Sequence, residues 1–338
     1  MVEVDNLTKR YGDMIAIDGV TFQAREGEIL AFLGKNAAGK TTTMRIMTGF
    51  MPPTSGTVRI NGHDILEDSL EARRQIGYLP ETAPLYEDMS VRGYLRFCAR
   101  LREVPPAEVD GRVETVMQSV NIHQRRDWQI GKLSKGLRRR VGLAQSLVHN
   151  PKVLILDEPT EGLDPEQIIE IRHLIRGLRG DHTVILSTHI LPEAQMLADR
   201  IVIINSGRIV AVDTAENLTA AVQRAQRLRV QVAGPVRAVR ERLQAIPAVQ
   251  RVEVLDADEG RFIVESARET DIRERLAAEV IRAGWGLLEL ERLEPTLEDV
   301  FLQITARKAP TGAPREDGLR SSDRAEAVPE EVTEVATP

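Results

Sequence analysis

The sequence predicts an α/β protein built on a buried parallel β-sheet, followed by a smaller α+β unit. Three short and mostly apolar runs, 29–33, 153–156 and 183–187, are typical of strands that are buried on both faces. Helical patterns separate these runs, as expected for parallel strands joined by crossovers. Over 225–305 the expected order changes to strand, helix, two strands, helix and strand, which predicts a ferredoxin-like module.

The first of these strands leads into a glycine-rich segment that fits the pattern G-x-x-x-x-G-K-[ST]. A strand, a glycine-rich turn and a helix start form an anion site, because backbone N–H groups point into the loop and the helix N-terminus adds partial positive charge. Lys40 would reach the terminal phosphates of a nucleotide, and the Thr41 hydroxyl would hold Mg²⁺. The candidate phosphate-binding residues are Gly34, Lys35, Asn36, Ala37, Ala38, Gly39, Lys40, Thr41 and Thr42.

Polar side chains stand where the other two buried strands end. Asp157 and Glu158 close the run 153–156, and His189 follows the run 183–187. Ligands bind beyond the carboxyl ends of strands in an open parallel sheet. We therefore expect Asp157 to face the Mg²⁺ and Glu158 to polarise a water beside the terminal phosphate.

An aromatic residue and a second anion site complete the candidate constellation. Tyr11 precedes the glycine-rich segment and could stack on a purine, although an ordinary surface tyrosine fits its position as well. Ser134 and the N–H of Gly136 lie at the start of a basic helix, where they form a second anion site. The arginines at 138–140 in that helix also fit a solvated charged face. Two helical patterns within 90–130 form an insert between the two anion sites.

Composition limits the classes of function. The 338 residues suffice for about two domains, and 42% hydrophobic with 28% charged residues is usual for a soluble globular protein. A net charge of −6 gives no reason to expect nucleic-acid binding. The single cysteine, Cys98, suits a reducing compartment, and no apolar run is long enough for a membrane span. Residues 307–338 are expected to be disordered.

Residues 2–215 together resemble the ATP-binding subunit of an ABC transporter. The resembling motifs are Walker A (34–42), the signature loop (133–137), Walker B (153–158) and the D-loop (161–164). The resemblance implies that Tyr11 stacks on the base, that His189 is the switch histidine, and that Glu81 replaces the loop glutamine near nucleotide and Mg²⁺.

The resemblance also implies an organisation into domains and partners. An ABC-type P-loop NTPase domain is expected over 1–220, with a parallel-sheet core, an antiparallel β subdomain and a helical subdomain at about 82–135. An accessory α+β domain is expected over 225–305, and residues 295–301 resemble the tail of subunits that serve ABC-2 type exporters. In this family two copies close face to face on two ATP molecules.

A homodimer in the cytoplasm, attached to the inner face of the cell membrane through an integral-membrane permease, is therefore expected. The insert and the loop that contains Pro84, Leu85 and Tyr86 would contact the permease.

Four positions depart from the family pattern. They are Lys35 for proline, Ala37 for glycine, Glu81 for glutamine and Leu137 for a polar residue. Two alternatives to transport remain: a soluble ABC ATPase of translation or DNA repair, and a nucleotide-sensing module without useful hydrolysis. The chain has one cassette, and the stretch between Lys40 and Ser134 is too short for the coiled coil of repair members.

Overall fold

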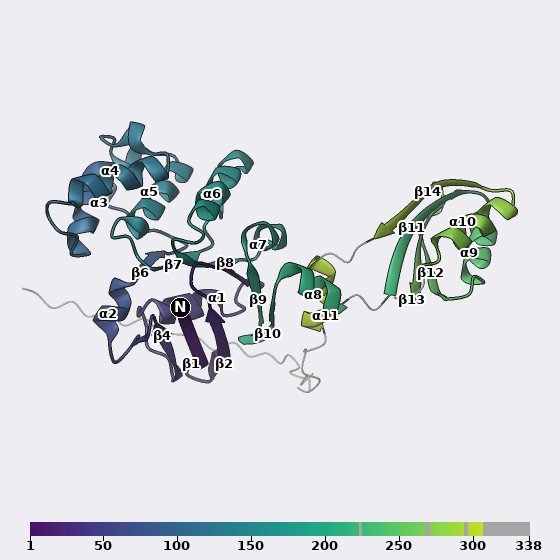
Figure 1. Cartoon of the computed structure of the whole chain (residues 1–338), viewed down its shortest axis with the longest axis horizontal. Coiled ribbons are helices and arrows are strands. Elements are labelled where there is room, and N and C mark those ends of the chain that lie inside the picture. The colour runs from purple at the N-terminus through teal and green to yellow at the C-terminus, as the bar shows by residue number, and fades with distance from the viewer. Residues whose placement is uncertain (223–224, 268–270, 294–296, 307–338) are drawn as a thin grey trace, which may run out of the picture. The chain divides into compact units, whose positions relative to one another are not determined.

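The computed structural model describes residues 1–222, 225–267, 271–293 and 297–306 (Figure 1). The predicted disorder of 307–338 lies outside the described residues, as do residues 295–296 at the start of the ABC-2-like tail. Within the described residues, no helix combines the length and the apolar character that crossing a membrane requires.

A six-stranded sheet forms the centre of the first part of the chain. Its strands are, in spatial order, β10 (Arg208–Asp213), β9 (Arg200–Asn205), β3 (Ile29–Leu33), β8 (Thr183–Thr188), β7 (Val153–Asp157) and β6 (Ile76–Leu79). All neighbours are parallel except β9 and β10. Every residue of β3, β7 and β8 is buried, so the parallel strands predicted from the apolar runs are confirmed.

The sequence pattern predicts two hairpin turns, one at 26–28 and one at 205–207 between the apolar runs 201–205 and 208–212. The second is confirmed between β9 and β10, and its turn residues Ser206 and Gly207 have φ angles of 48° and 77°. Positive φ at both positions is the geometry of the tight hairpin turn. The predicted hairpin-like turn at 26–28 is wrong, because the strands on either side of it belong to different sheets.

An antiparallel sheet carries the N-terminus. It consists of β2 (Met14–Ala24), β1 (Val2–Tyr11), β4 (Ser55–Ile60) and β5 (His63–Asp64), in that spatial order. Its buried face shares one hydrophobic cluster with the core sheet and the helix after β3. Phe22 of β2 packs on Phe32 of β3 with ring centroids 5.1 Å apart, which joins the two sheets.

Helices connect and cover these sheets (Figure 1). They are α1 (Lys40–Met47), α2 (Ser69–Arg74), α3 (Val91–Leu101), α4 (Val109–Ser119), the 3₁₀ turns His123–Arg125 and Ile130–Lys132, α5 (Lys135–Leu147), α6 (Pro165–Gly177) and α7 (Leu191–Leu197). The hydroxyl of Ser90 accepts from Gly93 N at 3.1 Å and caps α3, and Asp164 caps α6 ahead of Pro165. Helices α3 and α4 form the predicted helical insert and pack together and on α5.

The last sheet has the ferredoxin-like topology that the sequence predicts. Its elements are β11 (Ala225–Ala233), α9 (Val236–Gln244), β12 (Val249–Asp256), β13 (Arg261–Ala267), α10 (Arg273–Arg282) and β14 (Gly286–Leu293). The strands lie in the order β12-β13-β11-β14 and are all antiparallel. The start of β11 pairs with the end of β14, since Arg227 faces Leu293.

Two helices flank this ferredoxin-like unit in sequence. Helices α8 (Ala215–Val222) and α11 (Leu297–Ala306) pack against each other, and α11 also contacts α7. Leu297, Val300 and Phe301 of α11 lie in the hydrophobic cluster that also contains the core sheet and Leu218 of α8. The range expected for the accessory domain, 225–305, therefore includes a helix whose buried side chains lie in the other cluster, and the division into domains stays a prediction.

Candidate functional site

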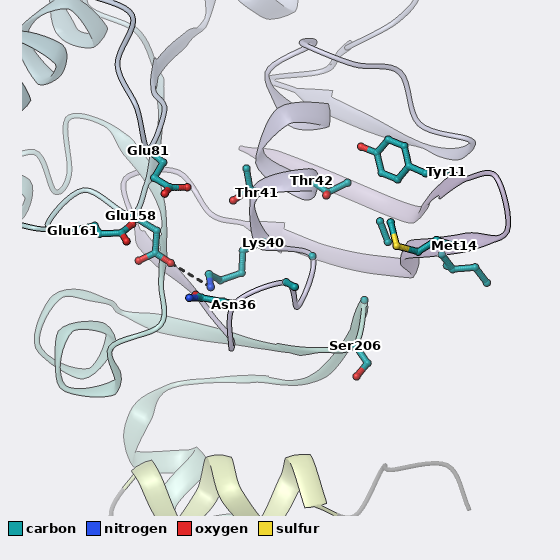
Figure 2. A pocket seen from close by; sticks show the side chains of 15 residues that line it. Tyr11, Met14, Asn36, Lys40, Thr41, Thr42, Glu81, Glu158, Glu161 and Ser206 are labelled. Atoms are coloured by element: carbon teal, nitrogen blue, oxygen red, sulfur yellow. Dashed lines mark ion pairs between the residues drawn. The ribbon is translucent and has the colours of Figure 1, made fainter. Parts of the chain in front are cut away.

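A cavity of about 470 Å³ opens at the carboxyl end of the core sheet (Figure 2). It brings together the glycine-rich loop, the end of β7, the end of β1 and the turn between β9 and β10. The lining residues are Tyr11, Met14, Ile15, Ala16, Asn36, Ala37, Gly39, Lys40, Thr41, Thr42, Glu81, Glu158, Glu161, Ser206 and Gly207. The structure thus places most of the predicted site residues around one space.

The glycine-rich loop has two glycines that side chains could not replace. A Cβ at Gly34 would lie 2.6 Å from the carbonyl oxygen of Ile204, and Gly39 has a φ of 106°. Ala37 has a φ of 62°, in the left-handed region that costs an L-residue about 1–2 kcal/mol. This conformation explains why the resembling family has glycine at that position.

Lys40 is buried at the bottom of the cavity. Its ammonium donates to the carbonyl oxygens of Gly34 at 2.8 Å and Lys35 at 3.2 Å, and it forms an ion pair with Glu158 Oε1 at 3.2 Å (Figure 2). The other carboxylate oxygen of Glu158 lies 3.0 Å from His189 Nδ1. Lys40, Glu158 and His189, predicted separately from three segments, therefore form one connected chain of polar contacts.

Asp157 has one satisfied oxygen and one without a partner. Its Oδ1 accepts from the hydroxyls of Ser187 at 2.5 Å and Thr41 at 3.4 Å, whereas its buried Oδ2 has no hydrogen-bond partner. Burial raises the pKa of Asp157, and the hydrogen bonds from Ser187 and Thr41 act in the opposite direction. A buried carboxylate oxygen that lacks a donor, close to the Thr41 hydroxyl, fits the needs of a hard cation such as Mg²⁺.

The remaining ligands of such a cation would be water molecules and phosphate oxygens of the nucleotide. Among the described residues, no group of three or more His, Cys, Asp and Glu side chains is arranged to hold a metal. Mg²⁺ usually keeps several waters and binds one or two protein groups plus substrate phosphates, which suits Thr41 and Asp157. Glu81 lines the same cavity (Figure 2), and its part in holding the metal stays a prediction.

A buried carboxylate that the sequence analysis did not identify links the loops after β7 and β8. Glu193 of α7 is fully buried and accepts from the hydroxyls of Thr160 at 2.5 Å and Thr188 at 2.6 Å. Thr160 lies two residues after Glu158, and Thr188 immediately precedes His189. Glu193 therefore fixes the distance between the two segments that carry these side chains.

The second anion site does not line the cavity. Ser134 caps α5, its hydroxyl accepting from Leu137 N at 3.3 Å, and neither Ser134 nor Gly136 is among the residues around the cavity. A Cβ at Gly136 would approach the amide oxygen of Gln167 to 2.1 Å. The two predicted anion sites therefore do not line one cavity in the described part of a single chain.

A parallel sheet, a phosphate-binding loop with a buried lysine, and paired acids at the end of β7 define a P-loop ATPase. The family model described as "ABC transporter" matches residues 17–161. The chain is 34% identical to the daunorubicin resistance ATP-binding protein DrrA3 of Streptomyces coeruleorubidus, over 90% of this chain and 95% of that protein. It is 33% identical to the Nod factor export ATP-binding protein I of Paraburkholderia xenovorans, over 91% and 97% of the two chains.

Solved structures agree with these relatives. A structure described as the ATP binding subunit of an ABC transporter superposes with a TM-score of 0.61 at 31% identity, covering 65% of this chain and 92% of that one. The chain belongs to the ATP-binding proteins of ABC transporters, and it is an ATPase.

Proposed function

We propose that this ATPase powers an ABC exporter of the ABC-2 type, through ATP-driven closure of a homodimer that is coupled to a membrane permease. The observation that carries the proposal is the single cavity that holds the phosphate-binding loop, Lys40 and Glu158, with Asp157 and His189 in contact with them. The export direction is taken from relatives that are named for export or for drug resistance.

ATP binding would break the ion pair between Lys40 and Glu158. The terminal phosphates of ATP would compete for the Lys40 ammonium, which now lies 3.2 Å from Glu158 Oε1. The released carboxylate is then free to accept a proton from the attacking water, while His189 remains beside its other oxygen and can donate to phosphate. Mg²⁺ held by Thr41 and Asp157 would neutralise phosphate charge.

An apolar platform at one end of the cavity fits the nucleotide base. Tyr11 and Met14 (Figure 2) line the cavity together with Ile15. The three side chains are 43%, 62% and 41% exposed, respectively. The Tyr11 hydroxyl donates to the sulfur of Met51 at 3.1 Å, which restricts the ring. An aromatic ring held in this way can stack on a purine without reading its hydrogen-bonding edge.

A second copy of the chain explains the separate anion site. Ser134 and Gly136 lie at the N-terminus of a 13-residue helix, where backbone N–H groups favour a phosphate, yet they do not line the cavity of their own chain. In the proposed homodimer, each nucleotide lies between Lys40 of one chain and Ser134 of the other.

A second cavity, of about 420 Å³, is the proposed contact for the permease. It is lined by residues of α1, β6, α3 and α5 and of the segments that follow α1, β6 and α3: Arg45, Phe50, Tyr78, Pro80, Thr82, Ala83, Pro84, Tyr94, Arg102 and Gln145. Phe50 is 73% exposed, and Tyr86 beside Tyr94 is 53% exposed. Exposed aromatic side chains at the rim of a cavity are typical of protein interfaces. Attachment there would hold the chain at the inner face of the cell membrane.

The experiment is an ATPase assay on the chain purified with its permease. Glu158→Gln and Lys40→Ala are expected to lower turnover at least 100-fold, whereas Lys152→Ala, an exposed lysine away from the cavity, should leave it unchanged. Near-normal turnover in the first two variants would contradict the proposed roles. Recovery of the chain without any multi-span membrane protein would favour a soluble ATPase, and ATP binding without turnover by the wild-type complex would favour a nucleotide sensor.

A further inference from the structure

Arg139 of α5 is buried, and all its donors point at main-chain carbonyl groups. Its Nε donates to Pro159 at 2.9 Å, one terminal nitrogen donates to Pro80 at 2.8 Å and Glu81 at 2.7 Å, and the other donates to Asp157 at 2.7 Å and Glu158 at 2.5 Å. A guanidinium has five N–H donors in a rigid planar fork, so these five acceptors satisfy it completely.

Burial lowers the pKa of Arg139, while the nearby acids Asp157, Glu161, Glu81 and Glu158 act to raise it. None of the ion pairs found among the described residues involves Arg139. A buried guanidinium whose direct partners are all carbonyl groups fixes the positions of those groups relative to one another, since each is held by a directional bond.

The carbonyl groups belong to two loops that carry candidate chemistry. Pro80 and Glu81 follow β6. Asp157 is the last residue of β7, and Glu158 and Pro159 follow it. Arg139 itself lies in the second turn of the helix that Ser134 caps. One side chain therefore joins the first half of α5 to the loops that hold Glu81 and Glu158.

The main chain of Glu158 has a conformation that requires hydrogen bonds to hold it. Its φ of 47° lies in the left-handed region, which a non-glycine residue occupies only where its surroundings hold it there. Its N–H donates to Ser187 Oγ at 2.9 Å, and its carbonyl oxygen accepts from Arg139. The main chain of Glu158 is thus held on both sides, which directs its carboxylate toward Lys40.

The neighbouring arginines have different contacts, although the three look alike in sequence. Arg138 is more exposed and pairs with Glu87 at 3.3 Å. Arg140 is as buried as Arg139, but it donates to the carbonyl of Val120 at 3.0 Å and pairs with Glu170. The alternative prediction of a solvent-exposed charged face at 138–140 is therefore wrong for Arg139 and Arg140, which are buried.

We propose that Arg139 is a positioning residue for hydrolysis. It sets the catalytic carboxylate of Glu158 and the loop of Glu81 relative to α5, so that a phosphate docked at Ser134 of this chain affects the geometry of the same chain's own hydrolytic site. The effect of Arg139 on ATP hydrolysis rests on the proposed function, whereas its effect on the positions of the two loops does not.

The test uses Arg139→Lys in the full chain with its permease, and Arg140→Lys as the matched control on the same helix. Three quantities are measured: kcat for ATP, the Kd of the purified chain for ATP by displacement of a fluorescent analogue, and amide hydrogen exchange in peptides over 79–83 and 157–163. A lysine keeps the positive charge but cannot donate to five carbonyl groups. The variant therefore distinguishes the effect of the lost hydrogen bonds from the effect of the charge.

For Arg139→Lys we expect kcat to fall at least tenfold, the Kd for ATP to change less than threefold, and exchange to increase in both peptides. Arg140→Lys should keep kcat within threefold of wild type and increase exchange near 119–122 instead. If Arg139→Lys does not fold, Arg139→Gln, a neutral side chain with two donors, carries the same test.

Unchanged exchange in both peptides would overturn the proposal, as would a fall in kcat matched by an equal loss of ATP affinity. A wild-type complex without turnover would remove the proposed function, and the exchange measurement would then decide the positioning role alone.

Discussion

The substitution Asp157→Asn is expected to stabilise the protein while removing its activity. The Oδ2 atom of Asp157 is buried without a donor, and the side chain is 1% exposed. A buried polar group without a partner costs about 1–3 kcal/mol, and more when it is charged. Asparagine keeps the Oδ1 that accepts from Ser187 and Thr41 and places a neutral amide nitrogen at the position of Oδ2, so that an unpartnered buried charge becomes an unpartnered neutral group, which costs less to bury. The free energy of unfolding should therefore rise by about 1–3 kcal/mol without nucleotide and Mg²⁺.

The pH dependence of the stability gained by Asp157→Asn follows from the direction in which the pKa of Asp157 is shifted. Since burial raises the pKa of Asp157 above its unfolded value, the folded state binds more protons between the two pKa values. Wild-type stability attributable to this group therefore falls as the pH rises through that window. The advantage of Asp157→Asn should be largest at neutral pH and vanish below the unfolded pKa of about 3.9.

Urea unfolding of both proteins, with and without Mg²⁺ and ATP, measures these differences. Mg²⁺ with ATP should stabilise the wild type and have a much smaller effect on the variant, because a ligand stabilises only the state that binds it. Asp199→Asn is the matched control: Asp199 accepts from Ile29 N at 2.9 Å and pairs with Arg179, so its loss should destabilise the fold. A variant Asp157→Asn that is less stable than wild type in the absence of ligands would refute the reasoning.

Three further outcomes are expected. Glu193→Ala leaves two buried threonine hydroxyls without an acceptor and should lower the free energy of unfolding by about 2–4 kcal/mol, measured in urea; a loss below about 0.5 kcal/mol would show that Glu193 does not link the loops. Ala37→Gly relieves the φ of 62° and should tighten ATP binding about two- to fivefold in a displacement assay, and weaker binding would argue against strain at this position. Tyr11→Ala should weaken ATP binding at least fivefold and Tyr11→Trp restore it; equal affinities in all three proteins would exclude base stacking.

Local signals in the sequence predicted the parts of the site that lie in one segment. The apolar run ahead of Gly34 and the pattern ending in Lys40 and Thr41 define strand, loop and helix together, so the loop could be placed without knowing the rest of the fold. Asp157 and Glu158 could be placed because a carboxylate pair after a buried strand must emerge at one edge of the sheet.

Contacts that depend on strand register and helix docking could not be predicted in the same way. Ser187 faces Asp157 only because β7 and β8 pair in that register, although both residues stand at predicted strand ends, which is the one signal that could have indicated it. The burial of Arg139 depends on how α5 docks onto two loops, and a charge run carries no information about that. The turn at 26–28 shows the same limit, since its local pattern does not reveal that the flanking strands join different sheets.

The ferredoxin-like unit begins and ends at adjacent points of its own sheet, since Arg227 at the start of β11 faces Leu293 at the end of β14. Helices α8 and α11, on either side of it in sequence, already touch each other. Excising the unit and rejoining these two helices by a short tether would thus leave the cassette's packing intact.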